Sequence, residues 1–281
     1  MNYRHAFHAG NFADVLKHAV LARVLVYLTR KESPFRFIDT HAGAGRYDLK
    51  SEAATRSPEW RDGIARVLTA RPPAAVAELL GPYLKAVGPY DVEGRPLSYP
   101  GSPAVAQALM RLQDRIALSE ANPLEREALI AALGRDRRLS IVGTDGYVAL
   151  NAYLPPKERR GLVLIDPAFE ATDEADHVVR ALERALRKWP TGIYLLWYPI
   201  KDRDAPDALA RRLRKLALPN LLRSEIMVAP AHADSGLAGS GLILLNPPFK
   251  LDAELRARLP ELGRIMSPKA ACAVDWLTKQ T

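Results

Sequence analysis

The chain has 281 residues and a mass of 31.0 kDa, a length that suits one large domain with a small insertion better than three separate domains. Hydrophobic residues make up 48% and charged residues 26%, which allows a sizeable core and excludes a disordered chain. The single cysteine, Cys272, excludes a disulfide scaffold and a cysteine-based zinc site. Lys and Arg (40) exceed Asp and Glu (32) by 8, and this basic balance suits a partner rich in phosphate.

The first thirty residues carry no targeting or membrane signal. Residues 1–10 contain an arginine and two histidines and no apolar core, unlike a signal peptide. The apolar stretch over residues 13–28 is interrupted by Lys17, His18 and Arg23, unlike a membrane span. We therefore expect a cytoplasmic protein with no membrane association.

The hydrophobic pattern then predicts alternating helices and strands. A helix covers residues 11–31, where apolar residues recur at helical spacing. The predicted strands cover residues 35–38, 115–119, 139–142, 162–165, 193–197, 225–228 and 242–245, the last being the final core strand. Predicted helices cover residues 103–112, 173–188 and 205–216, and a further helix begins near residue 123.

Residues 47–97 interrupt this alternation. Two short helices are predicted there, one after Ser57-Pro58 and one over residues 76–84 that is broken at Gly81-Pro82. We expect a helical insert subdomain over residues 47–97. Residues 1–46 and 98–281 then form one Rossmann-like α/β domain, with a mostly parallel sheet covered by helices on both faces.

The first predicted strand runs into the glycine-rich turn Asp39-Thr-His-Ala-Gly-Ala-Gly45. Glycines at a strand end let the backbone approach a ligand closely. The turn is a poor dinucleotide fingerprint, because Asp48 occupies the third glycine position. If residues 47–97 are an insert, the next strand end supplies Glu120, whose carboxylate can accept both hydroxyls of a ribose. This pattern fits S-adenosylmethionine better than NAD, and the alternative is a purely structural glycine turn.

A second motif, Asp166-Pro167-Ala168-Phe169, follows the strand predicted over residues 162–165. The Asp166 carboxylate and the Pro167 carbonyl can each accept one hydrogen from an exocyclic amine, while Phe169 stacks on the base. Such stacking contributes about 1–3 kcal/mol per base. The alternative is an Asp-Pro turn with a buried phenylalanine.

A similar string, Asn246-Pro-Pro-Phe249, matches the amino-methyltransferase pattern more closely in its letters. It follows the last predicted strand, far from the crevice that the first and fourth strands flank in such folds. We therefore assign the working site to Asp166 and interpret residues 246–249 as a structural turn.

Four of the six histidines, His5, His8, His18 and His41, fall in the first 41 residues. Neither cysteines nor clustered carboxylates accompany them, so no metal site is predicted, and anchoring a cofactor carboxylate or an RNA phosphate fits better. Ser102 and the following proline have the pattern of a helix start, which is either structural or a carboxylate-binding helix N-terminus.

Taken together, the chain resembles the bacterial 23S rRNA (adenine-N6)-methyltransferase J family nearly end to end. The resemblance rests on Tyr3–Asn11, on the string from Ala13 to His18, on Asp39–Tyr47, on Tyr99–Pro103, on Gly161–Asp166, on Gly192–Pro199 and on the turn at Asn246. It implies a class I methyltransferase fold that uses S-adenosylmethionine to methylate the N6 amine of a specific adenine in 23S rRNA. The implied partner is protein-free 23S rRNA or an early assembly intermediate, bound by a monomer.

The resemblance also implies roles for individual residues. It makes Asp166 the catalytic residue and Tyr3 a contact to the RNA, alongside Pro167 and Phe169. The implied cofactor contacts are His18, His41, Ser102, Glu120, Asp145, Gly146 and Asp166.

This chain departs from the family pattern at Ala168, where relatives carry a second proline, and at Phe169, where they commonly carry tyrosine. The loss of a proline removes a fixed φ angle, so we expect reduced preorganisation and retained activity. Two alternatives stay open: the same fold acting on an amine of another base or on DNA, and an RNA-binding protein with a vestigial cofactor pocket.

Overall fold

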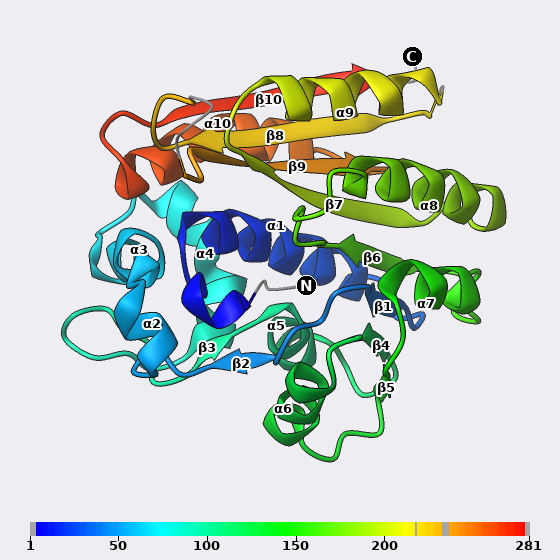
Figure 1. The fold of residues 1–281 in the computed structure, drawn as a ribbon, viewed down its shortest axis with the longest axis horizontal. Coiled ribbons are helices and arrows are strands. Elements are labelled where there is room, and N and C mark those ends of the chain that lie inside the picture. Colours follow the sequence, from blue (N-terminus) through cyan, green and yellow to red (C-terminus); the bar gives the residue numbers. More distant parts are fainter. Residues whose placement is uncertain (1–3, 217, 232–235, 279–281) are drawn as a thin grey trace.

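The computed structural model describes residues 4–216, 218–231 and 236–278. The sheet strands are β1 (Arg36–Asp39), β4 (Arg115–Ser119), β5 (Leu139–Val142), β6 (Gly161–Ile165), β7 (Ile193–Ile200), β8 (Leu221–Met227), β9 (Gly239–Leu245) and β10 (Ala271–Thr278). They form an eight-stranded sheet in the order β10-β8-β9-β7-β6-β1-β4-β5 (Figure 1).

The strands β5, β4, β1, β6 and β7 run parallel to their neighbours, whereas β9 is antiparallel to both β7 and β8, and β10 is antiparallel to β8. The predicted mostly parallel, Rossmann-like sheet is therefore confirmed. The prediction that residues 242–245 form the final strand is wrong, because β10 pairs with β8 at the sheet edge.

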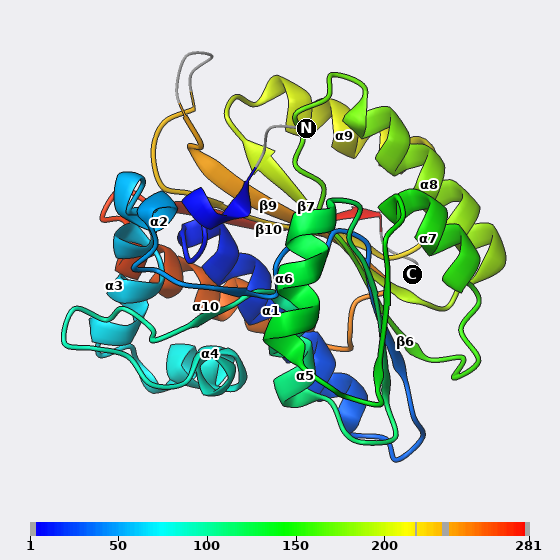
Figure 2. The same ribbon diagram turned by 60° about the horizontal axis from the view of Figure 1, so that its bottom comes forward.

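Helices cover both faces of the sheet. On one face lie α1 (Phe12–Thr29), α5 (Ser102–Leu109), α6 (Pro123–Leu133) and α10 (Leu251–Met266), and on the other lie α7 (Gly146–Tyr153), α8 (Glu174–Lys188) and α9 (Asp204–Lys215). Figure 2 shows α7, α8 and α9 along one side of the strands and α1 and α10 on the other. Each face has its own cluster of buried apolar side chains.

The helix α1 is buried on nearly all sides. Asn11 caps its start by accepting a hydrogen bond from the Asp14 N–H at 2.9 Å, and most of its 18 residues are shielded from solvent. It packs against the sheet strands β6, β7 and β9 on one side and against α5 on another. A helix buried all round is expected to be apolar, yet Asp14, Lys17 and His18 lie inside it at 4% exposure or less. Each of them therefore needs a polar partner.

Residues 47–97 hold α2 (Glu52–Arg56), the 3₁₀ turn η2 (Glu59–Asp62), α3 (Ile64–Thr69) and α4 (Ala74–Val87). Two short strands, β2 (Arg46–Tyr47) and β3 (Tyr99–Pro100), pair antiparallel at the two ends of this segment. We propose that it forms one helical insert, whose buried residues join the cluster around α1. The predicted break at Gly81-Pro82 is wrong, because α4 continues through Pro82 while Leu80 and Tyr83 stay buried beside it.

Within the described ranges, no helix combines the length and the apolar character that a membrane crossing requires.

Candidate active site and cofactor crevice

The predicted site residues gather at the carboxyl edge of the parallel strands. β4 and β6 flank β1 on its two sides, and β5 lies beyond β4. His41, Glu120, Asp145 and Asp166 follow the ends of these four strands. In open α/β sheets, ligands bind in the crevice outside this edge.

The glycine-rich turn after β1 contacts the end of β4. Gly43 and Gly45 adopt positive φ angles of 60° and 75°, which favour glycine. The Gly43 N–H donates to Oε2 of Glu120, and the Asn122 N–H donates to Oε1, both at 2.8 Å. Because each carboxylate oxygen has a second lone pair, Glu120 can still accept two hydroxyl groups.

Asp145 caps the start of α7. Its Oδ1 accepts hydrogen bonds from the N–H groups of Tyr147 and Val148, at 2.9 and 3.0 Å. Gly146 lies against the end of β1, where a Cβ would sit 2.1 Å from the Thr40 carbonyl oxygen. The absence of a side chain at Gly146 therefore lets the start of α7 approach β1.

His41 projects from the same edge with a defined tautomer. The Thr40 hydroxyl lies 3.1 Å from the Leu164 carbonyl, which can only accept, and 2.7 Å from Nδ1 of His41. Thr40 therefore donates to Leu164 and accepts from Nδ1 of His41. Burial lowers the pKa of His41, so the ring is neutral and its Nε2 is an acceptor.

Below the turn, Asp39 is completely buried at the end of β1. The Ser102 hydroxyl donates to its Oδ2 at 2.6 Å, and the His41 N–H donates to its Oδ1 at 3.2 Å. Burial raises the pKa of Asp39 to about 7, the Ser102 hydrogen bond opposes this rise, and the charge of Asp166 adds to it. Ser102 thus acts here through Asp39 and lies at 5% exposure.

Asp166 lies at the end of β6 and binds Lys17 from α1. The Lys17 ammonium nitrogen is 2.6 Å from Oδ2 of Asp166. Lys17 is not among the site residues predicted from the sequence, where it stands out only as a charge that interrupts an apolar stretch. A lysine inside an otherwise apolar helix was the available signal, since buried ammonium groups need an anionic partner.

Beside Asp166, the motif supplies an aromatic surface. Pro167 is buried, and the partly exposed Phe169 adopts a positive φ of 51°. Its ring meets Trp197 of β7 edge-on, with ring centroids 6.1 Å apart. Lys17 lies 5.7 Å from the centroid of the Trp197 ring, and the indole N–H donates to Ser240. Trp197 is a second residue of this site that the sequence analysis did not predict.

His18, an expected cofactor contact, lies beneath the crevice surface and not on it. His18 is only 1% exposed, and its Nδ1 lies 3.0 Å from the hydroxyl of Tyr99, which in turn contacts the hydroxyl of Tyr83 in α4. Burial lowers the pKa of His18 to about 3, so this imidazole is neutral. Tyr3, the expected RNA contact, lies outside the described residues.

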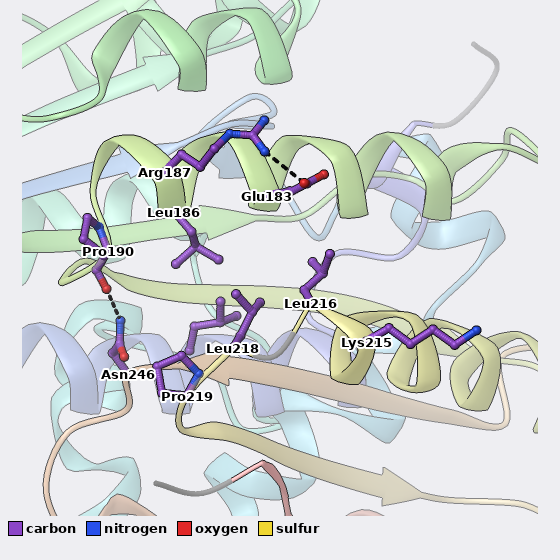
Figure 3. A pocket seen from close by; sticks show the side chains of 10 residues that line it. Glu183, Leu186, Arg187, Pro190, Lys215, Leu216, Leu218, Pro219 and Asn246 are labelled. Carbon is purple, nitrogen blue, oxygen red and sulfur yellow. Dashed lines mark hydrogen bonds and ion pairs between the residues drawn. The ribbon is translucent and has the colours of Figure 1, made fainter.

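The similar Asn246-Pro-Pro-Phe249 string lies at the opposite edge of the sheet. Leu245 pairs with Tyr194 near the start of β7, whereas Ile165 pairs with Leu196 further along that strand. The Asn246 side-chain amide donates to the carbonyls of Pro190 and Gly192, at 2.9 and 2.8 Å. Asn246 also lines a cavity of about 510 Å³ between the ends of α8 and α9 (Figure 3).

The N-terminal histidines pair with carboxylates. His5 contacts Asp14 and His8 contacts Glu59, each at 2.9 Å. In the portion of the chain that the structure describes, no cluster of three or more histidine, cysteine or carboxylate side chains is arranged to hold a metal ion.

Comparison with known proteins identifies the family of this chain. A family model described as "Ribosomal RNA large subunit methyltransferase D, RlmJ" matches residues 32–278. The chain belongs to this family. Over their full lengths, the "Ribosomal RNA large subunit methyltransferase J" proteins of Escherichia coli and Haemophilus influenzae are 38% and 36% identical to it.

Solved structures agree with this family membership. A crystal structure of a Legionella pneumophila protein has a TM-score of 0.85 at 33% identity and covers 96% of this chain and 98% of its own. A probable spermidine synthase from Corynebacterium glutamicum has a TM-score of 0.52 at 13% identity, covers 95% of this chain and 75% of its own, and shares the fold alone. The fold is that of a class I methyltransferase, and the RlmJ family comprises methyltransferases.

Proposed function

We propose that this protein transfers a methyl group from S-adenosylmethionine to the exocyclic N6 amine of a specific adenine in the 23S rRNA of the large ribosomal subunit. The observation that carries the proposal is the Asp166 carboxylate at the carboxyl end of β6, with Pro167 and the Phe169 ring beside it. The residues expected to bind the cofactor follow the ends of β1, β4 and β5 on the same edge of the sheet. Family membership supports the rRNA substrate, because the two curated relatives are named large-subunit rRNA methyltransferases.

The residues of the crevice fit an adenosine cofactor with an amino-acid tail. Glu120 has lone pairs for both ribose hydroxyls. Oδ1 of Asp145 caps α7, so its Oδ2 is the oxygen that can accept a hydrogen bond from the cofactor. The open glycine turn and the neutral His41 line the space beside them. Ser102 acts on this site indirectly, by donating a hydrogen bond to Asp39 at the end of β1. His18 lies in the core below the site and contacts the hydroxyl of Tyr99.

When bound, S-adenosylmethionine supplies an electrophilic methyl group on a sulfonium. Asp166 and the Pro167 carbonyl each accept one hydrogen of the adenine amine, which turns its nitrogen lone pair toward the methyl group. The nitrogen would gain the methyl as its bond to sulfur breaks and leaves a neutral thioether; the nitrogen then releases one proton, which Asp166 accepts and passes to water. Phe169 holds the flipped base by stacking. Positioning and electrostatics supply most of the acceleration.

The proposal extends to the RNA partner. The net charge of +8 favours contacts with the phosphate backbone, which make binding sensitive to salt. Tyr3 is proposed as an RNA contact, and the substrate as protein-free rRNA or an early assembly intermediate, bound by a monomer.

The test is methyl transfer from labelled S-adenosylmethionine to unmodified 23S rRNA, with digestion of the product to nucleosides. We expect N6-methyladenosine at one site with the wild-type protein. Asp166→Ala should reduce transfer by at least about 10³-fold, the scale on which removal of a positioned group acts in other enzymes. Cofactor binding by this variant should remain detectable by calorimetry.

The same assay separates the two alternatives. A different methylated nucleoside, or transfer to DNA alone, would replace the adenine of rRNA as the target. Cofactor binding without transfer to free rRNA or to an assembling large-subunit particle would point to an RNA-binding protein with a vestigial pocket.

A further inference from the structure

Asp14 is the centre of a buried polar cluster that reaches the catalytic motif. It lies at 1% exposure in the first turn of α1. Its Oδ2 accepts hydrogen bonds from the Gly10 N–H and from Nε2 of His5, both at 2.9 Å. Its Oδ1 lies 3.0 Å from the ammonium nitrogen of Lys17.

The charges of this cluster depend on one another. Burial by itself would raise the pKa of Asp14, but the contact from His5 and the ammonium charge of Lys17 hold it well below its usual value. Asp14 is therefore an anion, and Lys17 lies between two carboxylates, 3.0 Å from Asp14 and 2.6 Å from Asp166. A buried cation is tolerated only where anions compensate it.

This arrangement orients the carboxylate of Asp166. Lys17 occupies Oδ2 of Asp166 and leaves Oδ1 as the oxygen available to an amine. An ammonium group on a flexible four-carbon chain does not by itself define a direction. Asp14 supplies a further charged contact that helps to fix the ammonium position, because it lies one helical turn before Lys17 on the same face of α1.

We propose that Asp14 is a positioning residue for methyl transfer, which fixes the Lys17 ammonium and through it directs Oδ1 of Asp166 toward the target amine. This inference rests on the function proposed above, in which Asp166 binds that amine. Asp14 and Lys17 themselves contact neither the methyl group nor the reacting nitrogen in this scheme.

A double-mutant cycle tests the inference. The variants are Asp14→Asn, Lys17→Met and the double variant, measured as single-turnover transfer with saturating cofactor and 23S rRNA. We expect each single change to slow transfer about 100-fold, the scale of a small misplacement of a reacting group, while cofactor affinity and the KM for RNA change less than about threefold. The double variant should be no slower than Lys17→Met, because Asp14 acts only through Lys17.

A matched control separates positioning from stability. Asp114 is also fully buried and pairs with Arg111, in a turn before β4 at the far end of the strand from Glu120. Asp114→Asn should lower the melting temperature and leave the transfer rate at saturation unchanged. If Asp14→Asn does not fold, Asp14→Glu takes its place in the cycle, because it keeps the buried negative charge and moves the carboxylate relative to the Lys17 ammonium. It should slow transfer, and a wild-type rate in Asp14→Glu would overturn the inference.

Three further results would overturn the inference: wild-type rates in Asp14→Asn, an additive loss in the double variant, or a wild-type rate in the double variant. Failure of the proposed function has a different signature, because Asp166→Ala would then retain transfer. An inactive Asp166→Ala protein beside a fully active Asp14→Asn protein would refute the positioning role alone.

Discussion

At the scale of single residues, the buried Asp39 carboxyl should make the stability of the folded protein depend on pH. Its pKa rises from 3.8 to about 7 in the folded protein, chiefly because of burial. Below about pH 4 the carboxyl is protonated in both states, and between about pH 4 and 7 it is ionised only in the unfolded state. The folded protein binds more protons in that window, so stability falls as pH rises and then stays low above about pH 7.

Asp39→Asn removes this titration. Relative to wild type, the free energy of unfolding of the variant should increase by about 3 kcal/mol between pH 5 and pH 8, since each pH unit in the window is worth about 1.4 kcal/mol. Urea denaturation at the two pH values measures this difference. Glu127→Gln, which alters an exposed carboxylate on α6, is the control and should show no such change. If the stability difference between Asp39→Asn and wild type is the same at both pH values, Asp39 does not have the raised pKa.

The same scale shows which site residues a sequence can reveal. Glu120, Asp145 and Asp166 were predictable, because each follows an apolar strand and strand ends of a parallel sheet meet at one edge. Lys17 could be recognised as a cation in an apolar helix, but its partner Asp166 and the role of Asp14 could not be predicted, because no local pattern encodes the packing angle of α1. Trp197 escaped for a related reason, since it lies inside a predicted strand and its face depends on the register with β6.

At the scale of secondary-structure elements, the contact between the start of α7 and the end of β1 predicts the effect of a single methyl group. In Gly146→Ala, the new Cβ would lie 2.1 Å from the Thr40 carbonyl oxygen, so one of the two elements must move. The shift moves Asp145, which caps the start of α7, relative to the turn after β1. We expect cofactor affinity to fall at least about tenfold, or about 1.4 kcal/mol, measured by calorimetry with S-adenosylmethionine.

Asn151→Ala is the matched control for this change, because it alters an exposed residue on the same short helix. Its cofactor affinity should equal that of wild type. Unchanged binding in Gly146→Ala would show that the start of α7 does not form part of the cofactor crevice.

Element prediction succeeded where the hydrophobic pattern was strong and failed at the C-terminal end of the chain. The helix α10 contains Pro260, and β10 is a largely half-exposed edge strand, so neither gives a clean periodic signal. The antiparallel pairing of β9 with β7 and β8 could not be predicted either, because a continuous apolar strand gives no information on its direction in the sheet. The insert was predictable as helical, but its packing against α1 was not.

At the scale of the whole molecule, the sheet separates two strings with similar letters. Asp166 follows β6 at the carboxyl edge, and Asn246 follows the antiparallel β9 at the other edge. Their levels along the strands differ by about four residues, which at about 3.3 Å per residue is about 13 Å. Two motifs so placed cannot serve one bound base, so substitutions at the two positions should have opposite effects.

Asn246→Ala should destabilise the protein and leave methyl transfer within about twofold of wild type. The change removes two hydrogen bonds, to the Pro190 and Gly192 carbonyls, at a residue with a φ of 52° that asparagine adopts more readily than alanine. At about 1 kcal/mol per hydrogen bond, the free energy of unfolding should fall by about 2 kcal/mol. Asp166→Ala should show the reverse, losing transfer while keeping most of its stability, since Asp14 still compensates the buried Lys17 ammonium. Urea denaturation and the transfer assay on the same two preparations decide the matter. Loss of transfer in a folded Asn246→Ala protein would contradict this assignment, because it would place the reaction near Asn246 and not near Asp166.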